Sequence, residues 1–169
     1  SSLPSWLSFD AATRTFSGTP PVGTSLSDIT VKVTATDSLG LSTSDEFLIQ
    51  LADTTRPTIA ISSDKAALKK GETATITFTL SEASADFGEA GDITVTGGTL
   101  SALSAPTTNA QGQTVYTATF TPNANANNAC ATIHVASGKF SDAAGNFNAD
   151  GAEDNNTVTL AYDTSVPVA

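Results

Sequence analysis

One tract of the sequence, residues 140–150, combines the residue types that bind a hard cation. It reads Phe-Ser-Asp-Ala-Ala-Gly-Asn-Phe-Asn-Ala-Asp, so side-chain oxygens recur at short intervals along one loop. Ca²⁺ takes about six to eight oxygen ligands from carboxylates, amide carbonyls and backbone carbonyls. A loop of this composition supplies all three kinds, and its glycine permits a tight bend. The candidate ligand residues of the tract are Asp142, Gly145, Asn146, Asn148 and Asp150.

A second feature is a joint that occurs twice. The sequence Asp-Thr-Thr-Arg-Pro at residues 53–57 separates two strand-rich halves, and a near copy, Asp-Thr-Ser-Val-Pro, occupies residues 163–167. The carboxylates of the two joints, Asp53 and Asp163, are candidate calcium ligands. Asp53 can also be interpreted as the start of an extended linker, since the residue before a proline favours extended backbone. A repeated joint beside a calcium-type loop predicts a rod of β-modules stiffened by Ca²⁺.

The composition argues against several classes of function. The 169 residues include 17 Asp and Glu but only 7 Lys and Arg, and the net charge of −10 disfavours nucleic acid and anionic membranes as partners. No apolar run approaches the roughly 20 residues of a membrane-spanning helix. The single cysteine excludes an internal disulfide, so a secreted chain would need another staple, such as metal ions. The sequence begins without a signal peptide, and we expect a piece of a longer polypeptide.

The first part of the chain, residues 1–53, predicts short strands joined in hairpins. Residues 29–36 alternate apolar and polar positions with the period of a half-buried strand, and a turn follows at residues 37–40. These strands are too few to close a sandwich. We interpret the segment as the C-terminal half of a module whose other strands are missing or supplied elsewhere. The predicted strands are residues 6–9, 15–18, 29–36 and 47–51.

The second part, residues 54–163, predicts a complete β-sandwich. Seven short strands with alternating patterns fit an immunoglobulin-like architecture, although the Cys…Trp…Cys signature of antibody domains is absent. The predicted fold class is all-β, with tandem immunoglobulin/cadherin-like β-sandwiches of which the first is incomplete. Residues 164–169 are expected to begin a linker to the next module. The predicted strands are residues 58–62, 73–80, 93–97, 99–104, 115–120, 131–136 and 157–162.

Strand parity predicts which loops share one end of this sandwich. If the first strand runs away from the joint, the second strand returns and places the loop 81–92 beside it. The sixth strand also returns and places the loop 141–156 there. Acidic residues that crowd together repel one another unless cations neutralise them. Glu82 is a potential bidentate ligand in this group. The predicted group is Asp53, Glu82, Asp86, Glu89, Asp92, Asp142, Asp150, Glu153 and Asp154.

Each feature also has an interpretation without chemistry. The tract 140–150 can be a solvated loop in which Asp and Asn side chains cap their own backbone. His134 is the only histidine, on an outer strand face with Cys130, so neither a zinc site nor a Cys–His dyad is predicted. Trp6, Phe9 and Phe16 could stack on a sugar, but we favour packing of a small core. We expect no enzymatic activity.

Three motifs of the first part are Leu-Pro-Ser-Trp-Leu-Ser-Phe-Asp at residues 3–10, Thr-Phe-Ser-Gly-Thr-Pro at 15–20 and Val-Thr-Ala-Thr-Asp at 33–37. With these motifs, the first part resembles the second half of dystroglycan-type cadherin-like and putative Ig modules. In such modules the Asp of an Ala-x-Asp hairpin binds Ca²⁺ towards the preceding domain. Asp37 matches that position, so the resemblance adds it to the candidate ligands. The same Asp-x-x-Gly hairpin also forms without metal.

Five motifs of the second part are Asp-Thr-Thr-x-Pro-Thr from residue 53, Gly-Glu-Thr-Ala-Thr-Ile-Thr-Phe at 71–78, Ser-Glu-Ala at 81–83, Asp-Ile-Thr-Val at 92–95 and Ser-Asp-Ala-Ala-Gly-Asn at 141–146. With these motifs, the second part resembles a bacterial Ig-like repeat of the kind found in repeats-in-toxin adhesins, which are exported by type I secretion. The calcium-binding Gly-Gly-x-Gly-x-Asp nonapeptides of such adhesins are absent from this sequence.

Together, the two resemblances imply a segment of a secreted bacterial cell-surface adhesin for cell adhesion and biofilm formation, in which Ca²⁺ between domains rigidifies the stalk. Its partners would be neighbouring modules of the same polypeptide, with host or cell-surface ligands bound through other domains. We expect a monomer that does not insert into a membrane. The alternatives are a sugar- or peptide-binding module of the adhesin and an accessory β-domain of a secreted hydrolase.

Overall fold

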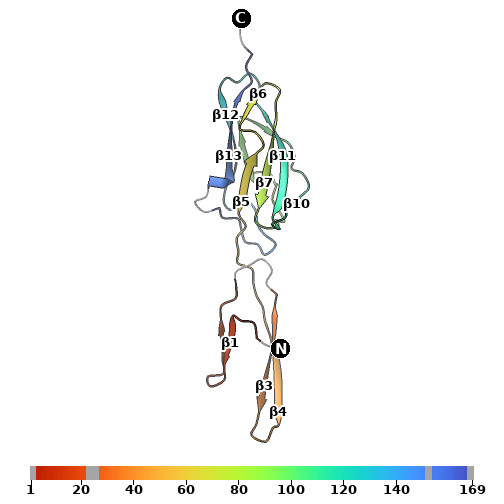
Figure 1. Ribbon diagram of the computed structural model, residues 1–169, viewed down its shortest axis with the longest axis vertical. Helices are drawn as coiled ribbons and strands as arrows, with labels where there is room; N and C mark the ends of the chain where they lie inside the picture. Colours follow the sequence, from red (N-terminus) through yellow and green to blue (C-terminus); the bar gives the residue numbers. More distant parts are fainter. Residues whose placement is uncertain (1–2, 22–26, 151–153, 167–169) are drawn as a thin grey trace. The chain divides into compact units, whose positions relative to one another are not determined.

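The computed structural model describes residues 3–21, 27–150 and 154–166, and the chain forms two compact units (Figure 1). The first unit is Ser1–Thr55 and the second is Arg56–Ala169. In the described residues, the regular structure consists of strands and one 3₁₀ turn, η1 (Asp154–Asn156). This confirms the all-β fold class. None of these described residues belongs to a helix that is long and apolar enough to cross a membrane.

The described part of the first unit contains two antiparallel hairpins. β1 (Leu7–Asp10) pairs with β2 (Thr15–Gly18), and β3 (Ile29–Thr36) pairs with β4 (Ser42–Ile49). β4 begins five residues before the strand predicted at 47–51. Residues 42–46 are polar on both faces and show no alternation, but they pair with β3 out to Thr36.

Three aromatic rings of the first unit pack on one another. The ring centroids of Phe9 and Phe16 lie 4.6 Å apart, and those of Phe16 and Phe47 lie 5.5 Å apart. This arrangement favours the predicted packing role over a flat sugar platform. The cluster remains open to solvent, since Phe47 exposes 41% of its surface and Leu48 exposes 53%. The hairpins also line a hollow of about 700 Å³ beside Phe9, Phe16 and Val31.

The second unit is a sandwich of two sheets, and it contains all seven predicted strands. One sheet has the order β10-β11-β7-β5, with β9 also paired to β11, and the other has the order β6-β13-β12-β8. Only β6 and β13 pair in parallel among the described strands of this unit. The strands are β5 (Ile59–Ser63), β6 (Ala67–Lys69), β7 (Ala74–Leu80), β8 (Ile93–Thr96), β9 (Gly98–Leu100), β10 (Thr107–Thr108), β11 (Thr114–Pro122), β12 (Ala129–Val135) and β13 (Thr157–Asp163).

Two short strands were not predicted, and one predicted strand is shorter than expected. β6 and β10 have three and two residues, too few to show an alternating pattern. The strand predicted at 99–104 ends at Leu100. The next residues still follow β11 irregularly, because Ser101 N donates to Thr119 O and Ser104 N donates to Thr117 O. The bounds of these short strands are set by hydrogen bonding to a partner strand and not by alternation of apolar and polar residues in the sequence.

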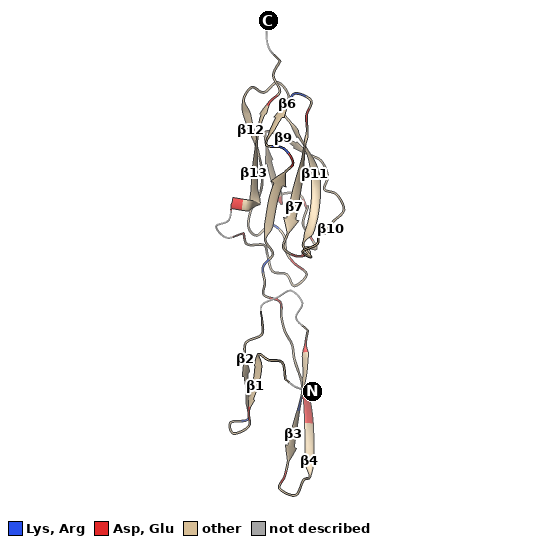
Figure 2. Cartoon of the chain, viewed as in Figure 1, with Lys and Arg blue, Asp and Glu red and all other residues tan. Residues whose placement is uncertain are grey.

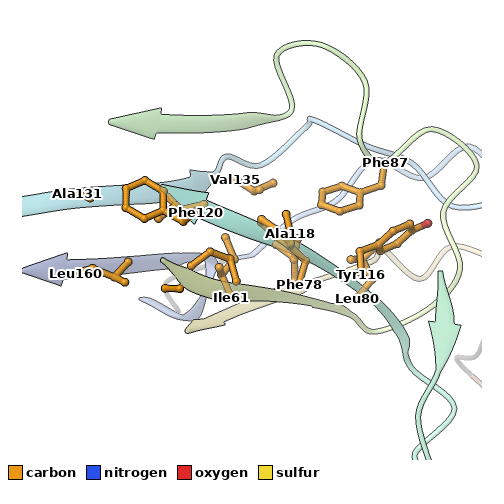
Figure 3. Packing of buried hydrophobic residues seen from close by; sticks show 14 of the residues in the cluster. Ile61, Phe78, Leu80, Phe87, Tyr116, Ala118, Phe120, Ala131, Val135 and Leu160 are labelled. Atoms are coloured by element: carbon orange, nitrogen blue, oxygen red, sulfur yellow. The ribbon is translucent and has the colours of Figure 1, made fainter. Parts of the chain in front are cut away.

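Alternation along the strands builds the core between the two sheets (Figure 3). In β7, the apolar side chains of Ala74, Ile76, Phe78 and Leu80 are buried, as the pattern predicted. Burial of each large side chain stabilises the fold by about 1.5–3 kcal/mol. Phe87, from the loop after β7, closes one end of the core. The centroid of its ring lies 5.2 Å from that of Tyr116 and 5.2 Å from that of Phe140.

We expect the two units to differ strongly in hydrogen exchange. Amides of β3 and β4 should exchange with solvent on the order of a hundredfold faster than those of β7 and β11, because only the second ladder belongs to a closed core. Hydrogen–deuterium exchange with mass spectrometry on the whole chain measures both ladders in one sample. Equal protection in the two ladders would contradict the interpretation of the first unit as an incomplete module.

Candidate metal centre

Two connections meet at the end of the second unit where β5 begins, and we call this end the N-terminal pole. The β7–β8 loop joins it through Ser81 N, which donates to Thr58 O at 2.9 Å. The β12–β13 connection joins it through Ala149 N, which donates to Pro57 O at 3.0 Å. Strand parity predicted this meeting of loops. Figure 2 shows red acidic segments in the loops at this pole.

Asp142 forms the centre of a tight turn in the β12–β13 connection. Its Oδ1 accepts hydrogen bonds from Ala144 N and Asn146 N, both at 2.8 Å, and its Oδ2 accepts one from Asn146 Nδ2 at 2.9 Å. The turn requires the predicted glycine, since Gly145 has a φ of 87°. Burial alone would raise the pKa of Asp142, but the hydrogen bonds from Asn146, Ala144 and Gly145 lower it overall from the ordinary value. The carboxylate is therefore held ionised, with only 4% of the residue exposed.

Glu82 and Asp142 bring two carboxylates together at the N-terminal pole. Each offers an oxygen atom, and the two oxygens lie within 4.8 Å of each other. Two oxygens bound to one Ca²⁺ at 2.3–2.6 Å can be at most about 5 Å apart, so this pair fits a shared calcium ion. Glu82 is half-buried and Asp142 is buried, which strengthens their mutual repulsion in the absence of a cation.

Asn148 supports the loop backbone from inside. Only 1% of it is exposed, and its Oδ1 accepts hydrogen bonds from Lys139 N at 2.7 Å and Phe140 N at 3.2 Å. Its Nδ2 donates to Ala136 O at 3.0 Å and to Asp150 Oδ2 at 2.8 Å. The amide thus satisfies four groups of the β12–β13 connection. Its assignment as a calcium ligand stays a prediction.

Asp150 fastens the same connection to the first strand of the sandwich. Its Oδ1 accepts a hydrogen bond from Ile59 N at 2.7 Å, and its Oδ2 accepts the bond from Asn148. Ile59 starts β5, so a carboxylate 91 residues further along the chain satisfies the first amide of that strand. A calcium-binding role for Asp150 likewise stays a prediction.

Asp86 joins the two connections, a role that sequence reasoning missed. Its Oδ1 accepts hydrogen bonds from Ser141 N at 2.7 Å and Ser84 Oγ at 3.0 Å, and its Oδ2 accepts one from Ser141 Oγ at 2.9 Å. The backbone N–H of Ser141 is the main cause of a lowered pKa for Asp86, and burial opposes it. No local pattern announces this contact, because Ser141 is 55 residues away.

Three further candidate ligands, Asp37, Asp53 and Asp163, have hydrogen bonds of their own. Asp53 belongs to the first unit, where its Oδ1 accepts a hydrogen bond from Thr55 N at 2.8 Å. Asp37 closes the β3–β4 hairpin, and its Oδ1 accepts bonds from Leu39 N and Leu41 N, both at 2.9 Å. Asp163 ends β13, and Glu153 falls outside the described residues. Metal binding by Asp37, Asp53 and Asp163 stays a prediction.

The histidine and the cysteine occupy separate positions on β12. His134 is half-buried, and its Nδ1 lies 2.8 Å from Thr157 Oγ1 on the neighbouring β13. Cys130 is exposed, as predicted. Of the described residues, one group of three or more acidic, histidine or cysteine side chains meets the spacing of a metal site, and it contains neither His134 nor Cys130.

Two family profiles match the chain, one for each part. The profile of the Bacterial Ig-like domain family matches residues 53–160, and that of the Putative Ig domain family matches residues 1–52. No curated protein matches the chain. Ig-like β-sandwich domains are typically non-catalytic, and families of this kind are common in surface and adhesin-type proteins. Bacterial Ig-like domains often lie in extracellular or surface proteins.

We expect Asn148→Ala to destabilise the second unit by at least about 2 kcal/mol, because the N–H groups of Lys139 and Phe140 and the carbonyl of Ala136 lose their partner and a buried side chain is truncated. Urea unfolding followed by circular dichroism measures the loss. Asn127→Ala is the matched control at an exposed position. A loss no larger than that of the control would show that Asn148 does not support the connection.

We expect the second unit to lose stability in acid as Asp86 and Asp142 become protonated. Their folded pKa values lie below the ordinary value of 3.8, so their stabilisation is complete above that pH and is lost as the pH falls through the folded values. Urea unfolding at a series of pH values between about 5 and 2 measures the free energy of unfolding as a function of pH. Asp86→Asn keeps the size of the side chain but removes one titrating group, and should flatten the curve. Asp154→Asn removes one charge at an exposed position and serves as the control. If Asp86→Asn left the pH dependence of the unfolding free energy unaltered, protonation of Asp86 would not be a cause of the acid destabilisation.

Proposed function

Since the chain belongs to the bacterial Ig-like domain family, we propose that it is a non-catalytic, calcium-rigidified extender or split-module segment of a large bacterial surface adhesin. In this proposal, the protein acts outside the cell, in cell adhesion and biofilm formation. Its task is mechanical: it carries load between other modules of the same polypeptide and keeps their orientation.

The observation that carries the proposal is the carboxylate pair of Glu82 and Asp142. A protein rarely holds two partly desolvated carboxylates within 4.8 Å unless a proton or a cation offsets their repulsion. The hydrogen bonds to Asp142 lower its pKa and so disfavour a shared proton. A hard divalent cation would neutralise the pair, and oxygen ligands of this kind select calcium.

Asp53 is the third ligand in the proposal. It is the first residue of the family match and precedes Pro57 by only four positions. Pro57 is buried at the N-terminal pole and accepts the hydrogen bond from Ala149 N. A spacer of four residues extends at most about 14 Å, so Asp53 remains within reach of the pole. A cation bound to Asp53 as well as to Glu82 and Asp142 would restrict the segment that connects the two units.

The open first unit supports the split-module part of the proposal. Its described residues supply four strands, whereas an immunoglobulin-like sandwich needs about seven. The hollow beside Phe9, Phe16 and Val31 is bordered by strands with unpaired edges. We therefore interpret the hollow as the unfilled half of a core that further strands complete. The alternative is a pocket for sugar or peptide, because Thr30, Lys32, Thr34 and Glu46 also line the hollow beside its apolar residues.

Calcium binding to the whole chain tests the proposal. Isothermal titration should show saturable Ca²⁺ binding, and the melting temperature of the second unit should rise, because a ligand of the folded state stabilises by about 2.7 kcal/mol at a hundredfold excess over Kd. Glu82→Gln and Asp142→Asn should each weaken binding at least tenfold, and Asp53→Asn should weaken it as well.

The matched control is Asp154→Asn, which removes the same charge from the same β12–β13 connection at an exposed position. It should bind Ca²⁺ like the wild type. If the wild-type chain takes up no calcium at millimolar concentration, or if Asp154→Asn weakens binding as much as Glu82→Gln, the proposal is wrong.

A further inference from the structure

The end of the second unit opposite to the N-terminal pole contains a set of hydrogen bonds made by residues that lie beyond the family match. We call this end the C-terminal pole; it consists of the β11–β12 loop and residues 163–165. The match ends at residue 160. The structure nevertheless keeps the chain in contact with the sandwich for several residues beyond that point.

Thr164 makes three of these hydrogen bonds. Its Oγ1 donates to Asn123 O at 2.7 Å and accepts from Ala126 N at 3.0 Å. Its backbone N donates to Ala126 O at 2.8 Å, and Ser165 N donates to the same oxygen at 2.9 Å. Only 4% of Thr164 is exposed. One hydroxyl therefore bridges a carbonyl and an amide of a loop that lies about 40 residues earlier in the chain.

Both partners of Thr164 and the residues that flank it are themselves held in place. Asn123 N donates a hydrogen bond to Gly97 O at 2.9 Å. Ala126 is half-buried and packs against the core of the sandwich. On the other side, Asp163 Oδ1 accepts hydrogen bonds from Ser165 N at 3.0 Å and Ser165 Oγ at 2.6 Å, which hold the residues that flank Thr164 in a tight turn. The contact is thus anchored to the core through the loop.

We propose that residues 163–165 form a strap, with Thr164 as its positioning residue, that fixes the direction in which the chain leaves the second unit. The hydrogen bonds described for the strap join protein groups and do not themselves require a cation. The strap is independent of the calcium site proposed at the other pole. Val166, which follows it, is exposed and is therefore available to report the direction.

A distance measurement between two spin labels tests the strap. The chain has one cysteine, Cys130, which is exposed near the start of β12, and Val166→Cys supplies the second labelling site. Double electron–electron resonance on the labelled chain should give a narrow distance distribution. Thr164→Val, which keeps the shape but removes the hydroxyl, should broaden that distribution roughly twofold.

Two further variants separate positioning from folding. Thr164→Ser keeps the hydroxyl and should restore the narrow distribution. Thr159→Val makes the same chemical change at an exposed position on β13 and should leave the width unaltered. Circular dichroism melts verify that each variant is folded.

Two outcomes would overturn the strap. One is an equal width for the wild type and a folded Thr164→Val variant, which would mean that the hydroxyl does not restrain the chain. The other is a wild-type distribution that broadens when a chelator is added, which would mean that a metal, and not the strap, holds this segment. A narrow distribution that survives chelation supports the strap whether or not calcium binds at the N-terminal pole.

Discussion

The loops at the N-terminal pole depend on one requirement, that every buried backbone amide finds an acceptor. These connections have almost no ladder partners of their own, so side chains take the place of a neighbouring strand. Asp86 accepts from Ser141, Asn148 accepts from Lys139 and Phe140, and Asp150 accepts from the first amide of β5. Asp86 and Asp150 each accept from another segment and so join three separate pieces of chain, whereas Asn148 supports the backbone within its own connection. Using carboxylates for this purpose concentrates negative charge at the same pole as Asp142, and this charge is what the proposed calcium ion would offset.

The sequence predicted the sandwich better than it predicted the roles of the polar residues. The strands of the second unit were recognisable because alternation of apolar and polar side chains, as in β7, reflects a single buried face. Strand parity then correctly brought the two acidic connections together. It did not distinguish carboxylates that face a possible cation from those that accept amides, because that distinction depends on partners far away in the chain. Asp86 illustrates this limit: its partner Ser141 lies 55 residues away and is identified only once the β7–β8 and β12–β13 connections are folded against each other.

The first unit shows what a sheet loses without an opposing layer. β3 and β4 pair along their whole length, so backbone hydrogen bonding is complete between them. The side chains of β4 nevertheless remain exposed along almost all of the strand. Phe9, Phe16 and Phe47 reduce this exposure by stacking on one another, which buries part of each ring but leaves the hollow beside them. Backbone pairing between strands and burial of side chains in a core contribute separately to stability. The first unit has the complete strand pairing but only part of a core.

The parallel pairing of β6 with β13 has a mechanical consequence. β6 follows β5 near the start of the second unit, whereas β13 is its last strand, and Ala67, Leu68 and Lys69 lie opposite Ala161, Tyr162 and Asp163. Tension applied along the polypeptide pulls these two neighbours in opposite directions along their common axis. The hydrogen bonds between them are then sheared simultaneously instead of being unzipped one after another. A short, three-residue ribbon can in this way set the force at which the whole sandwich yields.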